Sequence, residues 1–359
     1  MDKILVVNSN WLGDALFSIP ALRAIKYGGE KQVYLATMLP GRCKRILEHN
    51  PLIEEIIEFD ENSSHKGLNA KIETIRYLRK SKFQKAIFLH RSLTKLLLSV
   101  SSGIPERAGY RRKKTALFLT DKIAAIEKDG LHKAQYFLNL AQALGYKESG
   151  SEYNFYVTPE EFKEATVLLE AKGIIPFNDK IIALHPGANW TPKQWPIKNY
   201  IEFIQLIFNY SPQIKIVLIG NKKEIPLTSK IKQAFPSNQN NIINLTGMTT
   251  LGTLGGVLLF SDILISGDSG PLHIGCALKP LLGIKQYKIP FCIGLYGATD
   301  PRLTGPLSGR YQILEGERRA DCNLPCHNFN CTDYRCIDSI SPERVMQVVK
   351  QSDILNKTN

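Results

Sequence analysis

Long apolar runs are scarce in this chain of 359 residues. The longest ones, such as Gly252–Phe260 and Ile214–Gly220, fall well short of the roughly 20 residues that a membrane span needs. The N-terminus also lacks the basic, apolar and small-residue regions of a signal peptide, and it leads directly into a strand-like segment. These absences argue against a membrane span and predict a cytoplasmic protein.

Acidic side chains are in the minority, because 33 Asp and Glu accompany 46 Lys and Arg and give a net charge of +13. The excess is concentrated in residues 62–133, which contain 17 basic and 5 acidic side chains. This segment predicts a polyanionic partner, either nucleic acid, a phosphorylated glycolipid or an anionic membrane surface. A charged face that only keeps the protein soluble is the alternative.

Repeats and low-complexity tracts are also absent, and the content of 43% hydrophobic and 22% charged residues is typical of globular domains. At about 150 residues per domain, the length predicts two domains. Apolar segments of strand length alternate with segments of helical period, which indicates parallel sheets covered by helices on both faces. The predicted fold class is α/β, with two Rossmann-like domains facing across a cleft.

The expected elements follow the same scheme in both halves. Strands are expected at Lys3–Asn8, Val33–Thr37, Glu54–Phe59, Lys85–His90, Lys180–His185, Ile214–Gly220 and Ile263–Ser266. Helices are expected at Gly13–Tyr27, Lys66–Lys82, Pro159–Lys172, Ile197–Tyr210, Thr249–Phe260 and Gly270–Leu278. A polar stretch at 145–158 separates the halves, so we expect an N-terminal domain over 1–155, a C-terminal domain over 156–340 and a final helical segment over 341–359.

Two loops after expected strands carry candidate chemistry. Segment 8–14 (NSNWLGD) ends in Asp14, which is either a helix cap or a carboxylate at a strand end that works as a general base. Segment 185–196 (HPGANWTPKQWP) contains Lys193 among small residues, a composition that suits a phosphate ligand, although a plain connection is the alternative. The GxxxxGK[ST] motif of Walker loops is absent.

Segment 266–273 (SGDSGPLH) leads from a strand into a helix. Asp268, Ser269 and Gly270 at a helix N-terminus can offer N–H groups and a hydroxyl to an anion, and His273 lies one turn further on. An ordinary N-cap followed by a histidine in the core is the alternative. Glu224 follows another strand, where a carboxylate often binds ribose hydroxyls, or it is an exposed acid of a first helical turn.

Four of the seven cysteines cluster near the C-terminus with the spacing C-x3-C-x4-C-x4-C. Four thiolates within this distance suit zinc or an iron–sulfur cluster, but the paired C-x2-C spacing of common zinc sites is missing. In a reducing cytoplasm Cys322, Cys326, Cys331 and Cys336 can equally stay free thiols.

Four blocks occur in the order WLGDALFSIPALRAIK, HPGANWTPKQWP, SGDSGPLHIGCAL and LYGATDP. Together they resemble the ADP-heptose:lipopolysaccharide heptosyltransferase family, glycosyltransferase family 9, and Cys322–Val345 resembles the tail of its second-heptose branch. The resemblance implies a GT-B architecture with the active site in the interdomain cleft and a final helix that crosses back to the N-terminal domain. The segment 278–294 is longer than is usual in the family and is expected to be a surface loop at the cleft edge.

The resemblance also implies roles for individual residues. Asp14 matches the proposed catalytic base, and Lys193 matches the lysine that contacts the donor diphosphate. The implied donor-binding residues are Thr191, Lys193, Glu224, Met248, Asp268, Ser269, Gly270 and His273, with Thr246 as an alternative neighbour of the adenine. For the acceptor, the basic half offers Arg91, Arg107 and Arg111, although solvation is an alternative for each of them.

The implied reaction is an inverting, metal-independent transfer of heptose from ADP-heptose to the anionic inner core of lipopolysaccharide. No DxD-type metal motif is present, and we expect no cofactor apart from the donor substrate. A monomer at the inner face of the cytoplasmic membrane of a Gram-negative bacterium, without nucleic acid, fits this activity. The alternatives are a family 9 transferase for another nucleotide sugar, a nucleic-acid-binding protein and a non-catalytic carbohydrate-binding protein.

Overall fold

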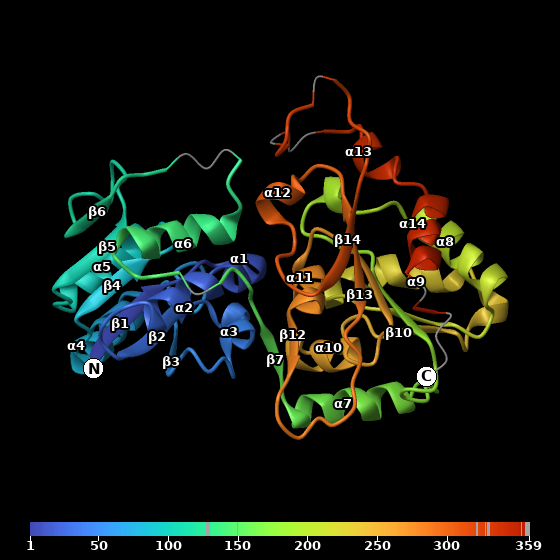
Figure 1. The fold of residues 1–359 in the computed structure, drawn as a ribbon, viewed down its shortest axis with the longest axis horizontal. Coiled ribbons are helices and arrows are strands. Elements are labelled where there is room, and N and C mark those ends of the chain that lie inside the picture. Colours follow the sequence, from blue (N-terminus) through green and yellow to red (C-terminus); the bar gives the residue numbers. More distant parts are fainter. Residues whose placement is uncertain are drawn as a thin grey trace. The chain divides into compact units, whose positions relative to one another are not determined.

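The computed structural model covers the chain as two compact units, Met1–Asn154 and Phe155–Asn359. The residues that the structure describes are 1–126, 130–148, 150–320, 322–326, 328, 331–352 and 354–355. Each unit is an α/β domain built on one six-stranded sheet, so the predicted fold class with two Rossmann-like sheets is confirmed (Figure 1). The division falls one residue before the expected one, and the mutual arrangement of the two domains stays a prediction.

The sheet of the first unit has the strand order β3-β2-β1-β4-β5-β6, and all of its neighbours pair in parallel. Its strands are β1 (Asp2–Val7), β2 (Val33–Leu39), β3 (Glu55–Glu58), β4 (Lys85–Phe88), β5 (Glu106–Tyr110) and β6 (Asp121–Ile123). The order reverses between β1 and β4, and ligands of open parallel sheets bind beyond the strand ends at this point. Asn8–Asp14 and the residues after Phe88 therefore share the edge where a ligand is expected.

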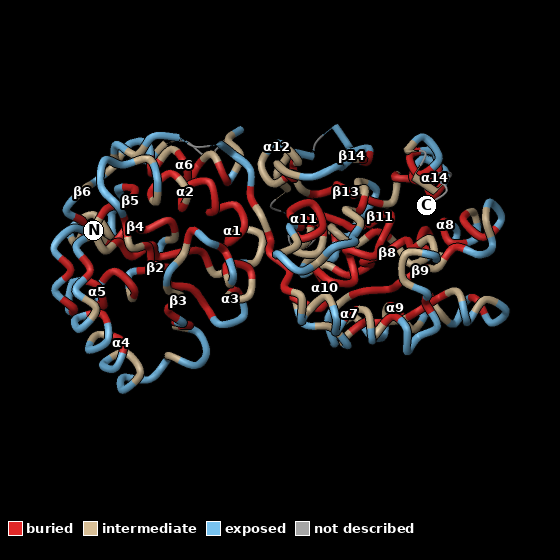
Figure 2. Tube along the Cα trace, turned by 60° about the horizontal axis from the view of Figure 1, so that its bottom comes forward, coloured by how far each residue is buried: buried red, intermediate tan, exposed pale blue. Residues whose placement is uncertain are grey.

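Helices cover both faces of this sheet. They are α1 (Leu12–Phe17), α2 (Ile19–Tyr27), α3 (Gly41–Leu47), α4 (Leu68–Ser81), α5 (Leu93–Ser101) and α6 (Lys133–Ala143). Leu5 and Val7 pack in one core with Leu78 of α4 and Leu96 of α5, whereas Val6 between them is buried on the opposite face. A strand that is apolar on both faces is typical of a central parallel strand, and Figure 2 shows the buried strands inside a more exposed outer layer.

The second unit repeats the topology with the order β10-β9-β8-β11-β13-β14. Its strands are β7 (Phe155–Val157), β8 (Ile181–His185), β9 (Lys215–Leu218), β10 (Ile242–Asn244), β11 (Ile263–Gly267), β12 (Leu278–Pro280), β13 (Phe291–Tyr296) and β14 (Arg310–Glu315). Strands β12 and β7 form a separate parallel pair. The order of the main sheet reverses between β8 and β11, so the residues after His185 and Gly267 meet at the expected ligand position.

The helices of the second unit complete its core. They are α7 (Pro159–Glu170), α8 (Ile197–Tyr210), α9 (Ile225–Gln233), α10 (Leu251–Leu258), α11 (Gly270–Ala277), α12 (Pro301–Thr304), α13 (Arg335–Asp338) and α14 (Pro342–Gln351), with 3-10 turns η1 (Thr191–Lys193), η2 (Lys222–Glu224) and η3 (Pro236–Asn238). Ile182 and Ile216 of the sheet pack with Phe203 of α8 and with Val345 and Val348 of α14. Helix α14 therefore packs within the second unit, and its expected crossing to the first domain stays a prediction.

Two of the expected segments have a different structure from the one expected. The helix expected over Gly13–Tyr27 is split at Ser18, because Pro20 has no N–H for helical hydrogen bonding and the Ser18 hydroxyl bonds Ala15 O at 2.7 Å and accepts from Asn8 Nδ2 at 2.8 Å. The segment 278–294, expected to be a surface loop, begins with strand β12 and ends inside strand β13, so only 281–290 connects the two. No helix in the described ranges is long and apolar enough to cross a membrane.

Candidate functional site

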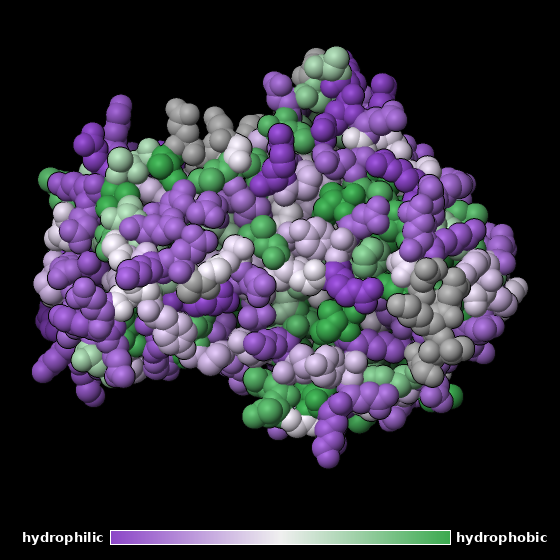
Figure 3. Space-filling model, viewed as in Figure 1, coloured by the Kyte–Doolittle hydropathy of each residue, from purple (hydrophilic) through white to green (hydrophobic). Residues whose placement is uncertain are grey.

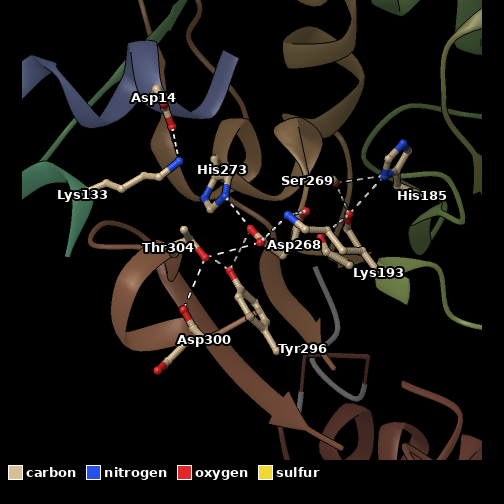
Figure 4. Close-up of polar contacts among 12 residues, drawn as sticks. Asp14, Lys133, His185, Lys193, Asp268, Ser269, His273, Tyr296, Asp300 and Thr304 are labelled. Atoms are coloured by element: carbon tan, nitrogen blue, oxygen red, sulfur yellow. Dashed lines mark hydrogen bonds and ion pairs between the residues drawn. The ribbon is translucent and has the colours of Figure 1, made fainter. Parts of the chain in front are cut away.

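Asp268 follows β11 and is the centre of a polar cluster in the second unit (Figure 4). Its Oδ2 accepts from Lys193 Nζ at 2.7 Å and from Thr304 Oγ1 at 3.3 Å, while its Oδ1 lies 3.3 Å from His273 Nε2. The Tyr296 hydroxyl donates to Thr304 O at 3.2 Å and lies 3.5 Å from Oδ1. One carboxylate thus joins the loop after β8, the helix α11 and the segment after β13.

The Asp268 side chain is only 5% exposed, and burial alone would raise its pKa. The hydrogen bonds and charges of His273 and Lys193 outweigh burial and hold the pKa of Asp268 well below its usual range. The carboxylate is therefore ionised at neutral pH and fixes the ammonium of Lys193 at the end of the sheet. A Cβ at Gly267 would lie 2.5 Å from Lys193 O, so only glycine permits this approach of the loop to β11.

A second network next to Asp268 is built around His185, the last residue of β8. Its Nδ1 lies 3.0 Å from Ser269 Oγ and 3.2 Å from Ser266 Oγ, and its Nε2 lies 3.4 Å from Glu224 Oε2. Burial opposes ionisation of Glu224, but the contacts with His185 and with Asn221 hold the pKa of the carboxyl below its usual value. The network therefore contains a carboxylate, an imidazole and a hydroxyl in series, which come from the ends of three strands.

The N-terminus of α11 is a candidate anion site between these networks. Its first turn presents the N–H groups of Gly270 and Leu272, since Pro271 has none. Ser269 has the extended backbone of an N-cap residue, with φ −150° and ψ 168°, but its side chain does not cap the helix. Together with the helix dipole and Lys193, this turn is suited to a phosphate.

The remaining predicted donor residues lie on the loops around this edge. Thr191 is exposed in η1, two residues before Lys193. Met248 follows β10 and is 49% exposed, and it has the large apolar surface that a planar base requires. Thr246 is buried, and its Oγ1 has no hydrogen-bond partner among the described residues. A Cβ at Gly187 would collide with the Glu224 carboxylate, so this glycine allows Glu224 to reach the loop after β8.

Asp14 belongs to the first turn of α1 in the first unit. Its Oδ1 accepts from Lys133 Nζ at 2.7 Å and its Oδ2 accepts from the Ser9 hydroxyl at 3.0 Å. The Asp14 side chain is 16% exposed and Trp11 at the helix start makes no side-chain cap. The carboxylate is therefore oriented by two neighbours and remains partly accessible, as a general base requires.

A buried lysine that is not among the predicted site residues lies on the same edge of the first unit. Lys95 in the first turn of α5 is fully buried, and its Nζ donates to Asn10 Oδ1 at 3.0 Å. Burial lowers the pKa of Lys95 to about 8 despite the nearby charge of Glu61. Asn10 Nδ2 also lies 3.5 Å from His90 Nε2. The segment after β1 is thus tied to the segment after β4, where the strand order reverses.

The three arginines proposed for the acceptor differ in their surroundings. Arg91 is exposed and lines a cavity of 30 Å³ together with His90 and Tyr110. Arg111 is also exposed, just after β5. The Arg107 guanidinium donates to Phe118 O at 2.8 Å and Pro105 O at 3.1 Å and also bonds Ile104 O, so it stabilises its own unit. Hydrophilic side chains cover most of the first unit in the view of Figure 3.

The C-terminal cysteines carry no disulfide, and all seven cysteines of the chain are free thiols. Burial and the neighbouring thiols of Cys326, Cys331 and Cys322 raise the pKa of Cys336. Within the residues that the structure describes, no group of three or more His, Cys, Asp or Glu side chains is arranged to hold a metal ion.

The structure brings Lys193, Asp268, Ser269, Gly270 and His273 together at one sheet edge, as their motifs predict. Sequence reasoning did not single out His185, Thr304 and Lys133. The position of His185 directly at a strand end is a signal that could have revealed it. Lys133 lies 119 residues from Asp14 in the sequence, and no local pattern connects the two.

Comparison with known proteins agrees with the fold and the motifs. The model of the family described as "Glycosyltransferase family 9 (heptosyltransferase)" matches residues 72–331. The chain is 26% identical to lipooligosaccharide heptosyltransferase 2 of Haemophilus influenzae over 88% of this chain and 90% of that protein. It shares the fold of a family 9 glycosyl transferase from Veillonella parvula, with a TM-score of 0.85, 20% identity and 99% coverage of both chains.

The chain also shares the fold of a solved Escherichia coli protein described as ADP-heptose lps heptosyltransferase II. The TM-score between the two is 0.76 and the sequence identity is 21%, again with 99% of both chains covered. The expected GT-B class of two parallel-sheet domains is thus confirmed at the level of the fold. The family match covers well over half of the chain. This protein therefore belongs to glycosyltransferase family 9 (heptosyltransferase) and is a glycosyltransferase.

Proposed function

We propose that this chain is an inverting, metal-independent heptosyltransferase that uses ADP-L-glycero-D-manno-heptose and extends the inner core of lipopolysaccharide. The carrying observation is the first turn of α11, which directly follows the buried Asp268 and its ion pair with Lys193, in a member of family 9. The names of its relatives, which include lipooligosaccharide heptosyltransferase 2, support the sugar and the acceptor class. The similar Escherichia coli protein is named as an ADP-heptose enzyme, which supports ADP-heptose as the donor.

The donor diphosphate is the group that this edge suits best. Negative charge grows on the departing diphosphate during transfer, and Lys193 with the N–H groups of Gly270 and Leu272 stabilises it where it develops. Glu224 accepts hydrogen bonds from the ribose hydroxyls, and Met248 with Thr246 contacts the adenine. Since these groups neutralise the diphosphate, the reaction needs no divalent metal.

Asp14 acts as the general base on the acceptor hydroxyl. Ser9 and Lys133 hold its carboxylate in one orientation, which favours proton transfer from a bound alcohol. The deprotonated hydroxyl attacks the anomeric carbon while the bond to the diphosphate breaks, and a single displacement of this kind inverts the configuration. Asp14 receives the proton, and ADP leaves with the charge.

The acceptor is anionic, and the basic segment 62–133 supplies the attraction. Arg91 and Arg111 are exposed and available to its carboxylates or phosphates, or to an anionic membrane face. On this proposal the enzyme works as a monomer at the cytoplasmic surface of the inner membrane of a Gram-negative bacterium.

A transfer assay tests the proposal directly. The purified protein is incubated with ADP-heptose and a heptose-deficient core acceptor, with EDTA present, and the product linkage is determined. Parallel reactions contain UDP- or GDP-sugars or the Asp14→Asn variant. We expect product only with ADP-heptose, with inverted configuration and with loss of turnover in the variant. Preference for another nucleotide sugar would assign a different glycan, and retained configuration would exclude the single displacement.

A further inference from the structure

Ser269 lies in the N-cap position of α11 but does not act as a cap. Its backbone has the extended conformation of an N-cap, and serine is among the preferred residues there because its oxygen accepts from the first-turn N–H groups. At α5, α7, α10 and α14 of this chain, a Ser or Thr in the same position does accept such a bond. The Ser269 hydroxyl instead lies 3.0 Å from His185 Nδ1 and 2.8 Å from Ser266 Oγ (Figure 4).

The positions of the ring hydrogens of His185 explain the orientation of the Ser269 hydroxyl. Its Nε2 contacts Glu224, whose carboxylate accepts hydrogen bonds when ionised, so Nε2 carries the ring hydrogen. In the neutral ring Nδ1 is then an acceptor, and it faces the hydroxyls of Ser269 at 3.0 Å and Ser266 at 3.2 Å; Ser266 donates to Gly267 O at 3.0 Å, which leaves Ser269 as the donor to Nδ1. The imidazole is buried, and Tyr200 fixes the end of β8 by donating to His185 O at 3.0 Å. The ring therefore has a defined position, with Nε2 toward Glu224 and Nδ1 toward the two serines.

We propose that His185 is a positioning residue of the donor site, and this inference rests on the proposed function. Its Nδ1 holds the Ser269 hydroxyl away from the first turn of α11, so that the N–H groups of Gly270 and Leu272 remain available to a donor phosphate. Without Nδ1, the hydroxyl rotates into the capping position and competes with the phosphate for the Leu272 N–H. Ser269 then acts as an internal inhibitor of the site that it borders.

The competition between the Ser269 hydroxyl and the phosphate leads to a prediction that does not apply to a histidine with a purely structural role. Loss of Nδ1 weakens binding only while residue 269 has a hydroxyl, and removal of this hydroxyl restores the binding. The variant of choice is His185→Gln, because glutamine keeps an N–H donor for Glu224 at the end of its side chain but has no acceptor at the Nδ1 position. The contact with Glu224, the residue proposed to bind the ribose, is thereby retained.

Calorimetric titration with ADP compares the wild type, His185→Gln, Ser269→Ala and the double variant. We expect about tenfold weaker binding for His185→Gln, since one capping contact has the strength of roughly a tenfold change in affinity. The double variant should recover most of this loss and bind ADP about as tightly as Ser269→Ala, because the competing hydroxyl is absent from both. Adenosine, which has no phosphate, should bind all four proteins equally.

Matched controls separate the possible outcomes. His65→Ala removes a histidine of the first unit that accepts from Asp60 N, and it should leave ADP binding unchanged. A double variant that binds as weakly as His185→Gln, or a loss of adenosine binding in parallel, would overturn the inference while leaving the proposed function intact. A wild-type protein that does not bind ADP would overturn both. If His185→Gln does not fold, the ADP affinities of Ser269→Thr, which retains the hydroxyl, and Ser269→Ala are compared instead. The comparison shows whether the hydroxyl is a ligand of the phosphate. A marked loss of ADP affinity in Ser269→Ala alone contradicts the inference.

Discussion

The Nζ of Lys193 lies 2.7 Å from Oδ2 of Asp268 and 3.4 Å from the carbonyl oxygen of the same residue. A lysine ammonium has three N–H donors, so Asp268 engages two of them and leaves one for another acceptor. The Lys193 side chain is 19% exposed, which allows an anion to reach it. Asp268 therefore orients the ammonium, and under the proposed function the third N–H donor binds the donor diphosphate.

Replacement of Lys193 tests its place in the donor site. Lys193→Gln keeps an N–H donor but removes the charge, and we expect ADP affinity to fall by about 10- to 100-fold, the range of a charge-assisted hydrogen bond. Calorimetry measures the affinity, and the transfer assay measures turnover. Lys198→Gln serves as a control, because Lys198 forms an exposed ion pair with Asp338. Unchanged affinity and turnover in Lys193→Gln would remove this lysine from the site.

The buried Asp268 should also make the second unit sensitive to acid. Its pKa lies below the ordinary value of 3.8, so its ionised form stabilises the fold above this pH, and the contribution is lost as the pH falls further. Asp268→Asn should lower the free energy of unfolding by about 3 kcal/mol at pH 7, because Lys193 loses its buried partner. Urea unfolding at pH 7, 4 and 3 should show this difference shrink in acid. A difference that is constant from pH 7 to 3 would contradict the assignment.

Asp14 and Lys133 should affect turnover to different extents. Asp14→Asn should lower kcat by at least about 100-fold, the contribution of a general base, without changing ADP affinity. Lys133→Met should lower kcat by no more than about fivefold, since the lysine side chain is 48% exposed and only orients the carboxylate. Steady-state kinetics measures both, with exposed Lys122→Met as a control. Equal losses in the two variants would mean that Lys133 itself contacts the reacting groups.

Lys95 should cause a pH-dependent stability of the first unit. Because its pKa falls from 10.5 in the unfolded chain to about 8 when folded, the buried charge destabilises the fold by about 3 kcal/mol below pH 8, and this effect disappears as the pH rises to 10.5. Lys95→Met should therefore be more stable than the wild type at pH 7. When unfolding by denaturant is measured from pH 7 to 10.5, the stability of the wild type should increase relative to that of the variant. A gap that does not change with pH would refute the lowered pKa.

The acceptor arginines should separate into two kinds. Arg91→Ala and Arg111→Ala should each raise the KM for the anionic acceptor, more at low than at high salt, because exposed charges are screened by ions. Arg107→Ala should instead lower the free energy of unfolding by about 1–3 kcal/mol, since its guanidinium holds three backbone carbonyls. Kinetics at two salt concentrations and denaturant unfolding test the division. A KM effect of Arg107→Ala at full stability would reinstate it as an acceptor residue.

Much of the fold follows from local sequence patterns, because central parallel strands are apolar on both faces. The expected segments Lys3–Asn8 and Ile263–Ser266 differ from the observed strands by single residues. Strands β5, β6, β7, β10, β12 and β14 were not predicted. Of the two edge strands β6 and β14, β6 is short and only partly buried and most of β14 is exposed, so neither has a continuous apolar run. Edge position, which depends on the tertiary fold, determines their pattern.

The candidate site is likewise only partly predictable from the sequence. Asp268, Lys193 and Asp14 follow predicted strands, so their presence at the ligand-binding edge is visible in the sequence. The partners that fix these groups come from distant segments: Thr304 lies 36 residues from Asp268, and Lys95 lies 85 residues from Asn10. Neither spacing has a periodicity that could be recognised. The orientation of Ser269 toward His185, rather than into its own helix, likewise depends on a strand 84 residues away.

The packing of α14 has a consequence for the order in which the protein is made. The Trp195 indole donates to Ile340 O across 145 residues, and Val345 and Val348 lie in one core with Phe203. Contacts in the first unit, by contrast, are complete once the segment up to residue 154 has left the ribosome. We therefore expect the first unit to fold during synthesis, whereas the core of the second unit cannot close until the segment through α14 has been translated.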